Sequence, residues 1–373
     1  MKRWIGGAII LTALMTQTGC GGQDRSPGAL QAAFFDCLLD GDTQTAYTAN
    51  TEGGIDALDL NTGAIRWSAA VQGKPLAVLD HRLVIQTPEP GRANAIRIVV
   101  LSTERVGERL RISDPVVFPS WVAVGVVHGR SFLSCGCIDK GALLLKWRAR
   151  AWWDKGHPSR EKERRAEKAA DGVARIDLTS GSVEMVDQKK LPVAVAQQLN
   201  RELGKATDRQ GHVLLRSAPQ PLIVGNCVVT ITEEIRPGQR ALVLKRQKFG
   251  TKEELESIRL TQGVCFGWDV LPDGRSVLVH QPVDEKRLDA DAKGWFVFSL
   301  ETGKLLTRFP REDDTRAITV LGRKAFYVIL GTHRKKAPGG SAWAQTLKVQ
   351  DVKTGQLLWQ CAIEDYRQAD APE

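Results

Sequence analysis

The sequence predicts an all-β fold built from repeated four-stranded units, and two observations carry that prediction. A ten-residue pattern recurs as LDLNTGAIRW at 58–67, IDLTSGSVEM at 176–185, FSLETGKLLT at 298–307 and QDVKTGQLLW at 350–359. Apolar and polar residues alternate ahead of the first glycine, which is the period of a strand and not of a helix. Repetition at intervals of tens of residues is typical of folds that stack similar units.

Each copy predicts a β-hairpin with a tight turn. In the first copy, Asn61, Thr62 and Gly63 form the connection, because glycine adopts the positive φ that such loops require. Asp59 and Thr62 can hydrogen-bond local backbone N–H groups. Trp67 stands at a fixed distance from the turn, where its ring can lie against the backbone of a neighbouring unit.

The shared frame is Asp-x-x-Thr/Ser-Gly-x-x-x-Trp, and we expect it to dock one unit onto the next. This role is structural and not catalytic. The residues that carry it are Ala57, Asp59, Thr62, Gly63, Trp67, Asp177, Gly181, Thr302, Gly303, Asp351, Thr354, Gly355 and Trp359.

Further β-rich pairs precede the turns and complete each unit. They are PLAVLDHRLVIQT, WVAVGVVHGRSFLSC, PLIVGNCVVTIT, CFGWDVLPDGRSVLVHQ and AITVLGRKAFYVILGT, and degenerate copies of the turn lie at 96–110 and 240–260. One unit is then about four strands in about 40 to 55 residues, the size of a propeller blade. We predict one β-propeller domain over 29–365, with six to eight blades and seven favoured, followed by a tail at 366–373.

The turn motif resembles that of the quinoprotein-type β-propellers, whose repeat ends in Ala-x-Asp-x-x-Thr-Gly-x-x-x-Trp. Residues 57–67 match this motif at every defined position, and 349–359 match it except that Val349 replaces the alanine. The resemblance implies a propeller fold. It leaves the activity open, because the family includes dehydrogenases that bind pyrroloquinoline quinone and outer-membrane assembly lipoproteins that bind no cofactor.

The N-terminus has the three-part pattern of a secretory signal. Lys2 and Arg3 precede a short apolar run, and small polar residues follow. The end of this stretch resembles a bacterial lipoprotein cleavage site, which implies a signal peptide at 1–19, acylation of Cys20 and a flexible tether at 20–28. Secretion without a lipid and an uncleaved anchor remain alternatives. We expect an exported lipoprotein on the periplasmic side or at the cell surface.

Two segments interrupt the strand pattern and predict short helical insertions. The first, 146–172, is rich in lysine and arginine and contains three tryptophans. It is either a partner or membrane surface or a solvated helix packed on the blade beneath. Its candidate surface residues are Trp147, Arg148, Arg150, Trp152, Trp153, Arg164 and Arg165.

The second insertion, 187–211, predicts an amphipathic helix that starts at Pro192. Its apolar side would carry Val193, Ala196, Leu199 and Leu203. We expect this helix to pack on the domain and not to bind a partner.

A search for catalytic motifs is negative, so we predict no catalytic, cofactor-binding or metal-binding residue. Six cysteines beyond Cys20 permit disulfides, but none forms a CxxC pair. Cys135 and Cys137 are expected to be buried thiols, and Gly136 separates them, unlike the adjacent pair of the quinone dehydrogenases.

The sequence therefore favours a non-enzymatic, membrane-anchored propeller that binds an envelope protein as a scaffold. The alternative is a quinone-dependent enzyme or a sensor of a small ligand in the axial funnel. The net charge of +9 does not indicate nucleic acid, because an exported protein does not meet it.

Overall fold

The computed structural model describes residues 31–34, 37–105, 107–124, 130–151, 168–205, 221–236, 239–251, 253–261, 267–271, 273–281, 294–309, 315–337 and 340–363. Within them, the strands form six antiparallel sheets, which we call blades 1 to 6 in chain order.

The strands of the six blades have the following bounds. Blade 1 contains β1 (Gln31–Phe34), β2 (Cys37–Asp40), β3 (Thr45–Ala49), β4 (Ile55–Asp59) and β5 (Ile65–Ala69), and blade 2 contains β6 (Lys74–Leu79), β7 (Arg82–Glu89), β8 (Arg92–Ser102), β9 (Arg109–Ile112) and β10 (Val116–Val117). Blade 3 contains β11 (Arg130–Asp139), β12 (Ala142–Ala151), β13 (Lys168–Asp177) and β14 (Val183–Val186), and blade 4 contains β15 (Leu222–Val224), β16 (Cys227–Arg236), β17 (Gln239–Lys248) and β18 (Ile258–Arg259). Blade 5 contains β19 (Gly267–Val270), β20 (Ser276–Gln281), β21 (Gly294–Ser299) and β22 (Leu305–Phe309), and blade 6 contains β23 (Thr315–Leu321), β24 (Lys324–Ala337), β25 (Gly340–Asp351) and β26 (Leu357–Ile363).

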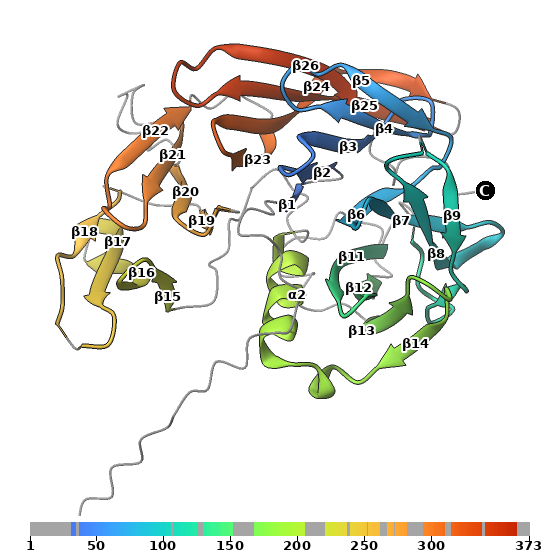
Figure 1. Cartoon of the computed structure of the whole chain (residues 1–373), viewed down its shortest axis with the longest axis horizontal. Helices are drawn as coiled ribbons and strands as arrows, with labels where there is room; N and C mark the ends of the chain where they lie inside the picture. The colour runs from blue at the N-terminus through green and yellow to red at the C-terminus, as the bar shows by residue number, and fades with distance from the viewer. Residues whose placement is uncertain are drawn as a thin grey trace, which may run out of the picture.

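Each blade is a meander whose strands pair in chain order, except that β9 and β10 both pair with β8. Figure 1 shows the blades following one another around a ring, with the early strands of each blade towards the middle. The predicted all-β propeller fold is therefore confirmed.

The favoured number of seven blades is not what the described residues form, since they make six. Strands β1 to β3 complete blade 1, in which β1 pairs with β2, β2 with β3 and β3 with β4. Within the described part of the pair predicted at 121–135, one strand is present, β11. Val122 and Val124 precede it outside any strand, yet both are buried in the core.

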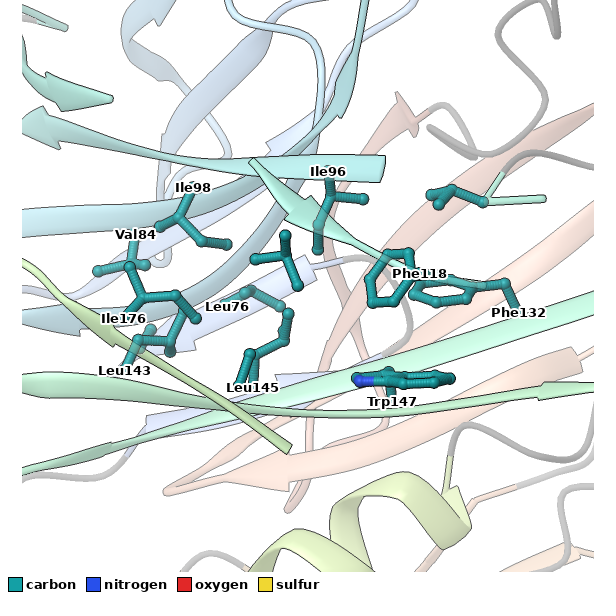
Figure 2. Close-up of a cluster of buried hydrophobic side chains, with 14 of the residues drawn as sticks. Leu76, Val84, Ile96, Ile98, Phe118, Phe132, Leu143, Leu145, Trp147 and Ile176 are labelled. Carbon is teal, nitrogen blue, oxygen red and sulfur yellow. The ribbon is translucent and has the colours of Figure 1, made fainter. Parts of the chain in front are cut away.

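The hydrophobic core lies between the blades, because each sheet carries apolar side chains on both faces. Blades 2 and 3 illustrate this: Leu76, Ile96 and Ile98 from blade 2 face Leu143 and Leu145 from blade 3 (Figure 2). Similar clusters join blades 1 and 2, 4 and 5, 5 and 6, and 6 and 1. Covering apolar faces in this way supplies the main driving force for folding.

A helix covers blade 3 on the side away from blade 2. The predicted second insertion forms a short 3-10 helix, η1 (Gln188–Lys190), and α2 (Val193–Lys205). Val195, Leu199 and Leu203 of α2 pack in one cluster with Cys135 and Leu144. Figure 1 shows α2 between blades 3 and 4.

The apolar side of α2 differs in one position from the sequence prediction. Val193, predicted to face the domain, is exposed, and Val195 is buried in its place. Val193 is the first residue of α2, so the helix turns its side chain away from the β11 and β12 surface.

Both ends of the predicted first insertion, 146–172, belong to strands of blade 3. Lys146–Ala151 continue β12, and Lys168–Gly172 begin β13; the two strands pair from Ala142 with Asp177 to Ala151 with Lys168. The predicted helix lies outside the described residues apart from its last part, which is strand. Trp147, Ala149 and Ala151 are buried at alternate positions of β12, which is the period of a strand.

Trp147 lies in this core and is 4% exposed, so it is not part of a partner surface. Its ring packs at 4.9 Å, centroid to centroid, from Phe118, and Gly172 opposite leaves room for it. Figure 2 shows the ring beneath Phe118 and Phe132.

Substituting Trp147 by alanine should lower the free energy of unfolding by about 3–5 kcal/mol, because the change leaves a large cavity between blades 2 and 3. Chemical denaturation measures this loss. Ile65, exposed on the rim of blade 1, is the control, and I65A should change the stability by less than about 0.5 kcal/mol. Equal effects of the two variants would contradict the buried position of Trp147.

Candidate functional site

The recurring turn between the last two strands of blades 1, 3, 5 and 6 has one hydrogen-bond pattern. In blade 1, Oδ1 of Asp59 accepts from the backbone N–H groups of Asn61 (2.8 Å) and Thr62 (3.0 Å). The N–H of Gly63 donates to the carbonyl of Asp59 at 2.8 Å, and the Thr62 hydroxyl accepts from the N–H of Ala64. The aspartate and the threonine therefore serve as local acceptors for the turn, and Gly63 adopts a φ of 71°.

The other three copies repeat this geometry. Asp177 and Asp351 each accept from two backbone N–H groups, and Ser299 accepts from Thr302 with its hydroxyl. Gly181, Gly303 and Gly355 occupy the glycine position with positive φ. Thr302 and Thr354 accept from the N–H two residues ahead, as Thr62 does. In all four turns, a side-chain oxygen at the first position therefore accepts from the backbone of the turn.

The carboxylates of these turns are held in the ionised state. A hydrogen bond from Arg66, together with the N–H groups of Asn61 and Thr62, lowers the pKa of Asp59 to about 2. Backbone hydrogen bonds also lower the pKa values of Asp177 and Asp351. The three carboxylates therefore act as hydrogen-bond acceptors within their own turns.

Trp359 joins the last blade to the first. Its indole N–H donates to the carbonyl of Leu60 at 3.1 Å, and its ring covers Gly63 so closely that a Cβ there would lie 2.7 Å from it. Lys324 of blade 6 adds a hydrogen bond to Asn61 of blade 1 at 2.6 Å. We call this arrangement the latch: an outer-strand residue of one blade seated on the turn of the next.

Other residues occupy the latch position where tryptophan is missing. The backbone of Ile112–Asp114 from blade 2 lies against Gly181 of blade 3, with Asp114 N–H donating to Gly181. Ile258 of blade 4 packs on Gly303 of blade 5. The Thr307 hydroxyl of blade 5 donates to Val352 of blade 6 at 2.6 Å.

Trp67 is half-buried beside the core between blades 1 and 2. It pairs with the buried Ala57 on the neighbouring strand, and its ring lies 5.9 Å from that of Tyr47. At the next turn, Ala69 approaches Gly107 of blade 2. The two complete motif copies therefore place their tryptophans in the seams on either side of blade 1.

Arg148 and Arg150 lie on β12 opposite the buried face of the strand. Trp147, Ala149 and Ala151 are buried, while the two arginines between them keep intermediate exposure. Trp152, Trp153, Arg164 and Arg165, the other candidates for the partner surface, lie outside the described residues, as does Cys20.

A buried polar cluster under α2 was not predicted. Lys146 is buried, and its Nζ donates to Gln188 at 3.0 Å and to Asn200 at 2.6 Å, while Gln188 donates to Asp171 at 2.9 Å. Burial lowers the pKa of Lys146. The pattern ALLLKWRARA, read as a continuous strand, puts Lys146 on the same face as Leu144 and would have indicated this position. The cluster ties α2 and η1 to blade 3.

The cysteines in the described part of the chain are not in disulfide bonds, namely Cys37, Cys135, Cys137, Cys227 and Cys361. Cys135 and Cys137 are buried under α2, as expected, and the Cys135 thiol donates to the Leu199 carbonyl at 3.3 Å. Burial raises the pKa of the Cys361 thiol to about 12. This thiol is protonated at neutral pH and is therefore a poor nucleophile.

Near the axis, β1 adds a strand to the inner edge of blade 1 and contacts β6 and β23 (Figure 1). The side chains of the described residues contain no group of three potential metal ligands. No helix in the described ranges is both long enough and apolar enough to cross a membrane.

Comparison with known proteins finds similarity only among solved structures. No protein-family model matches the sequence, and no curated protein is detectably similar to it. Hydrazine synthase of Kuenenia stuttgartiensis aligns over 90% of this chain and 80% of its own, with 12% identity and a TM-score of 0.28. The Cps50 (Swd1) β-propeller domain of Myceliophteria thermophila aligns over 89% and 86%, with 11% identity and a TM-score of 0.26. At these scores the alignments carry no argument about function.

Replacing Gly63 by alanine should destabilise the protein more than the same change at Gly91. Both glycines have positive φ, but Gly63 lies under the Trp359 ring and Gly91 has no atom near its missing Cβ. The difference isolates the latch and should be about 1–3 kcal/mol in the free energy of unfolding. Equal losses in denaturation experiments would show that the ring does not depend on close packing at this turn.

Asp59 should make stability sensitive to acid. Because the folded pKa lies below that of the unfolded chain, the carboxylate stabilises the fold above about pH 4, and this contribution disappears as the pH falls towards 2. Melting temperatures of the wild type and of D59N, measured across this range, should therefore converge at low pH. A gap that stays constant would indicate that the Asp59 charge has no role.

Proposed function

We propose that this chain is an exported, lipid-anchored propeller that acts as a protein-binding scaffold in the cell envelope. Its partner surface is the outer end of the β12–β13 hairpin together with the basic segment between these strands. The lipid is carried by Cys20, and the partner is a protein with an acidic surface.

The observation that carries the proposal is the alternation along β12. Trp147 and Ala149 belong to the core against blade 2 and Ala151 is buried, while Arg148 and Arg150 between them keep intermediate exposure. Two half-exposed arginines at the root of a basic segment favour association with acidic groups. Arginine is also common among residues that dominate binding energy at interfaces.

The N-terminal sequence and the turn motif support the location and the type of protein. Lys2, Arg3 and the apolar run before Cys20 are typical of a lipoprotein signal. The turn motif is similar to that of the quinoprotein-type propellers, which include assembly lipoproteins without a cofactor. In this chain, its residues are engaged in turns and latches.

The alternative is a quinone-dependent enzyme or a sensor with a small ligand in the axial funnel. That function needs space on the axis. We prefer the scaffold because β1 lies near the axis and contacts strands of blades 2 and 6.

Crosslinking in intact cells, followed by affinity purification and mass spectrometry, tests the partner surface. The variant R148E/R150E should recover an envelope partner at least about tenfold less than the wild type, because charge reversal repels an acidic surface. The control R92E/R109E makes the same charge change at exposed residues of blade 2 and should leave recovery unchanged. Equal recovery with all three proteins would contradict the assigned surface.

Cell fractionation tests the anchor in the same strains. Substituting Cys20 by alanine should move the protein from the membrane to the soluble fraction, since the acyl chains hold it there. If C20A stays with the membrane, the lipid is not the anchor.

A further inference from the structure

Two cysteines share the face of blade 3 that α2 covers. Cys135 and Cys137 are alternate residues of β11, so their side chains point to the same side of the sheet. They are 8% and 6% exposed, and both belong to the cluster that β11 and β12 form with Leu199 of α2. Figure 1 shows the helix beside these two strands. The helix therefore covers two sulfur atoms that come from neighbouring positions on one face.

The spacing of the two cysteines suits a single ion between them. Residues two apart on a strand have Cα atoms about 6.6 Å apart. Two sulfurs on opposite sides of one metal ion are about 4.6 Å apart, since a metal–thiolate bond is about 2.3 Å long. Rotation about χ1 moves each sulfur along the strand, so the two side chains can close this difference. The strand itself does not have to move.

Gly136 keeps the two cysteines on this face by fitting the packing on the other. It points towards blade 2, where an added Cβ would lie 2.8 Å from Leu143 and 3.5 Å from Leu76. The glycine is therefore explained by the core between blades 2 and 3, and it leaves the side towards α2 to the cysteines.

A buried positive charge lies directly beside the pair. Lys146 is the cross-strand partner of Cys135, and side chains in such positions have Cβ atoms about 4.5–5.5 Å apart. Its Nζ donates to Gln188 and Asn200, and both acceptors are uncharged amide oxygens. The carboxylate of Asp171 lies one hydrogen bond further away, on Gln188. An ammonium group buried among uncharged acceptors favours a negative charge close to it.

The donor set selects a soft ion with a low coordination number. Structural zinc sites have four ligands, and the part of the chain that the structure describes contains no group of three potential metal ligands. Copper(I) prefers thiolate ligands and is stable with two of them in a linear arrangement. Two thiolates and one copper(I) ion carry one net negative charge, which the ammonium of Lys146 neutralises.

We propose that Cys135 and Cys137 bind one copper(I) ion between their sulfur atoms, with Lys146 as the counter-charge. Two Cu–S bonds form as the two thiol protons leave to solvent, and the Cys135 thiol gives up its hydrogen bond to the Leu199 carbonyl. No electron is transferred, because the ion enters and remains as copper(I). The site needs neither the lipid anchor nor the basic segment, so it stands or falls separately from the proposed function.

The test uses the purified full-length chain and copper(I), kept reduced by ascorbate, in competition with the coloured chelator bicinchoninate. Samples are incubated to equilibrium, because α2 covers both thiols and has to move for the ion to enter. The C135S and C137S variants should each withdraw one equivalent of copper less than the wild type. X-ray absorption of the loaded wild type should show two sulfur neighbours at this ion. No withdrawal by the wild type, or equal withdrawal by the serine variants, would overturn the proposal.

Cys227 provides the matched control, since it is a half-buried thiol on β16 of blade 4. C227S should bind copper(I) like the wild type, and a loss equal to that of C135S would show that the thiols bind copper without a specific site. Copper(I) should also raise the melting temperature of the wild type and of C227S but not that of C135S. The same melting curves show whether each variant is folded.

Replacing Lys146 by glutamine tests the counter-charge. K146Q keeps a hydrogen-bonding side chain and removes the positive charge, so it should lower the affinity for copper(I) at least about tenfold. K140Q makes the same charge change at an exposed residue between β11 and β12 and should leave the affinity unchanged. Equal affinities of K146Q and K140Q would contradict the role of Lys146.

Discussion

A sheet with apolar side chains on both faces cannot stand alone in water, and the architecture of this protein follows from how each face is covered. Blades 1 and 2, 2 and 3, 4 and 5, 5 and 6, and 6 and 1 cover one another directly. Blade 3 is covered on its other side by α2, which takes the place of a neighbouring sheet. Among the described residues, sheet packing therefore closes five seams, and at the sixth α2 covers the face of blade 3.

Much of this fold could be predicted from the sequence, because the turn signal is local. The hydrogen bonds of Asp59, Thr62 and Gly63 all lie within residues 59–64. The motif therefore predicts a hairpin wherever it occurs. Strand alternation before each turn then indicates the rest of the blade. The number of blades was harder to predict, since it depends on which strands pair with which, and among the described residues the pair expected at 121–135 contains only β11.

The candidate site was harder to predict because it depends on neighbours that the sequence does not show. The composition of 146–172 suggests a solvated helix, but Trp147 is part of β12 and its ring packs against Phe118 and Gly172. Burial of Lys146 likewise depends on Asn200, which lies on a different element. The latch shows the same limit: Trp359, Ile258 and Thr307 occupy equivalent places, and only the first of them is recognisable as part of the motif.

The latch on blade 1 joins residues that are 299 positions apart in the chain. At ordinary rates of synthesis, the ribosome takes on the order of tens of seconds to cover that distance. During this time, Leu39 and Leu58 of blade 1 have no blade 6 to cover them. Contacts so distant in sequence also form slowly in folding. The first blade made is thus the last to be completed, and the apolar face that it holds open meanwhile is a surface for chaperones to bind and for aggregation to begin.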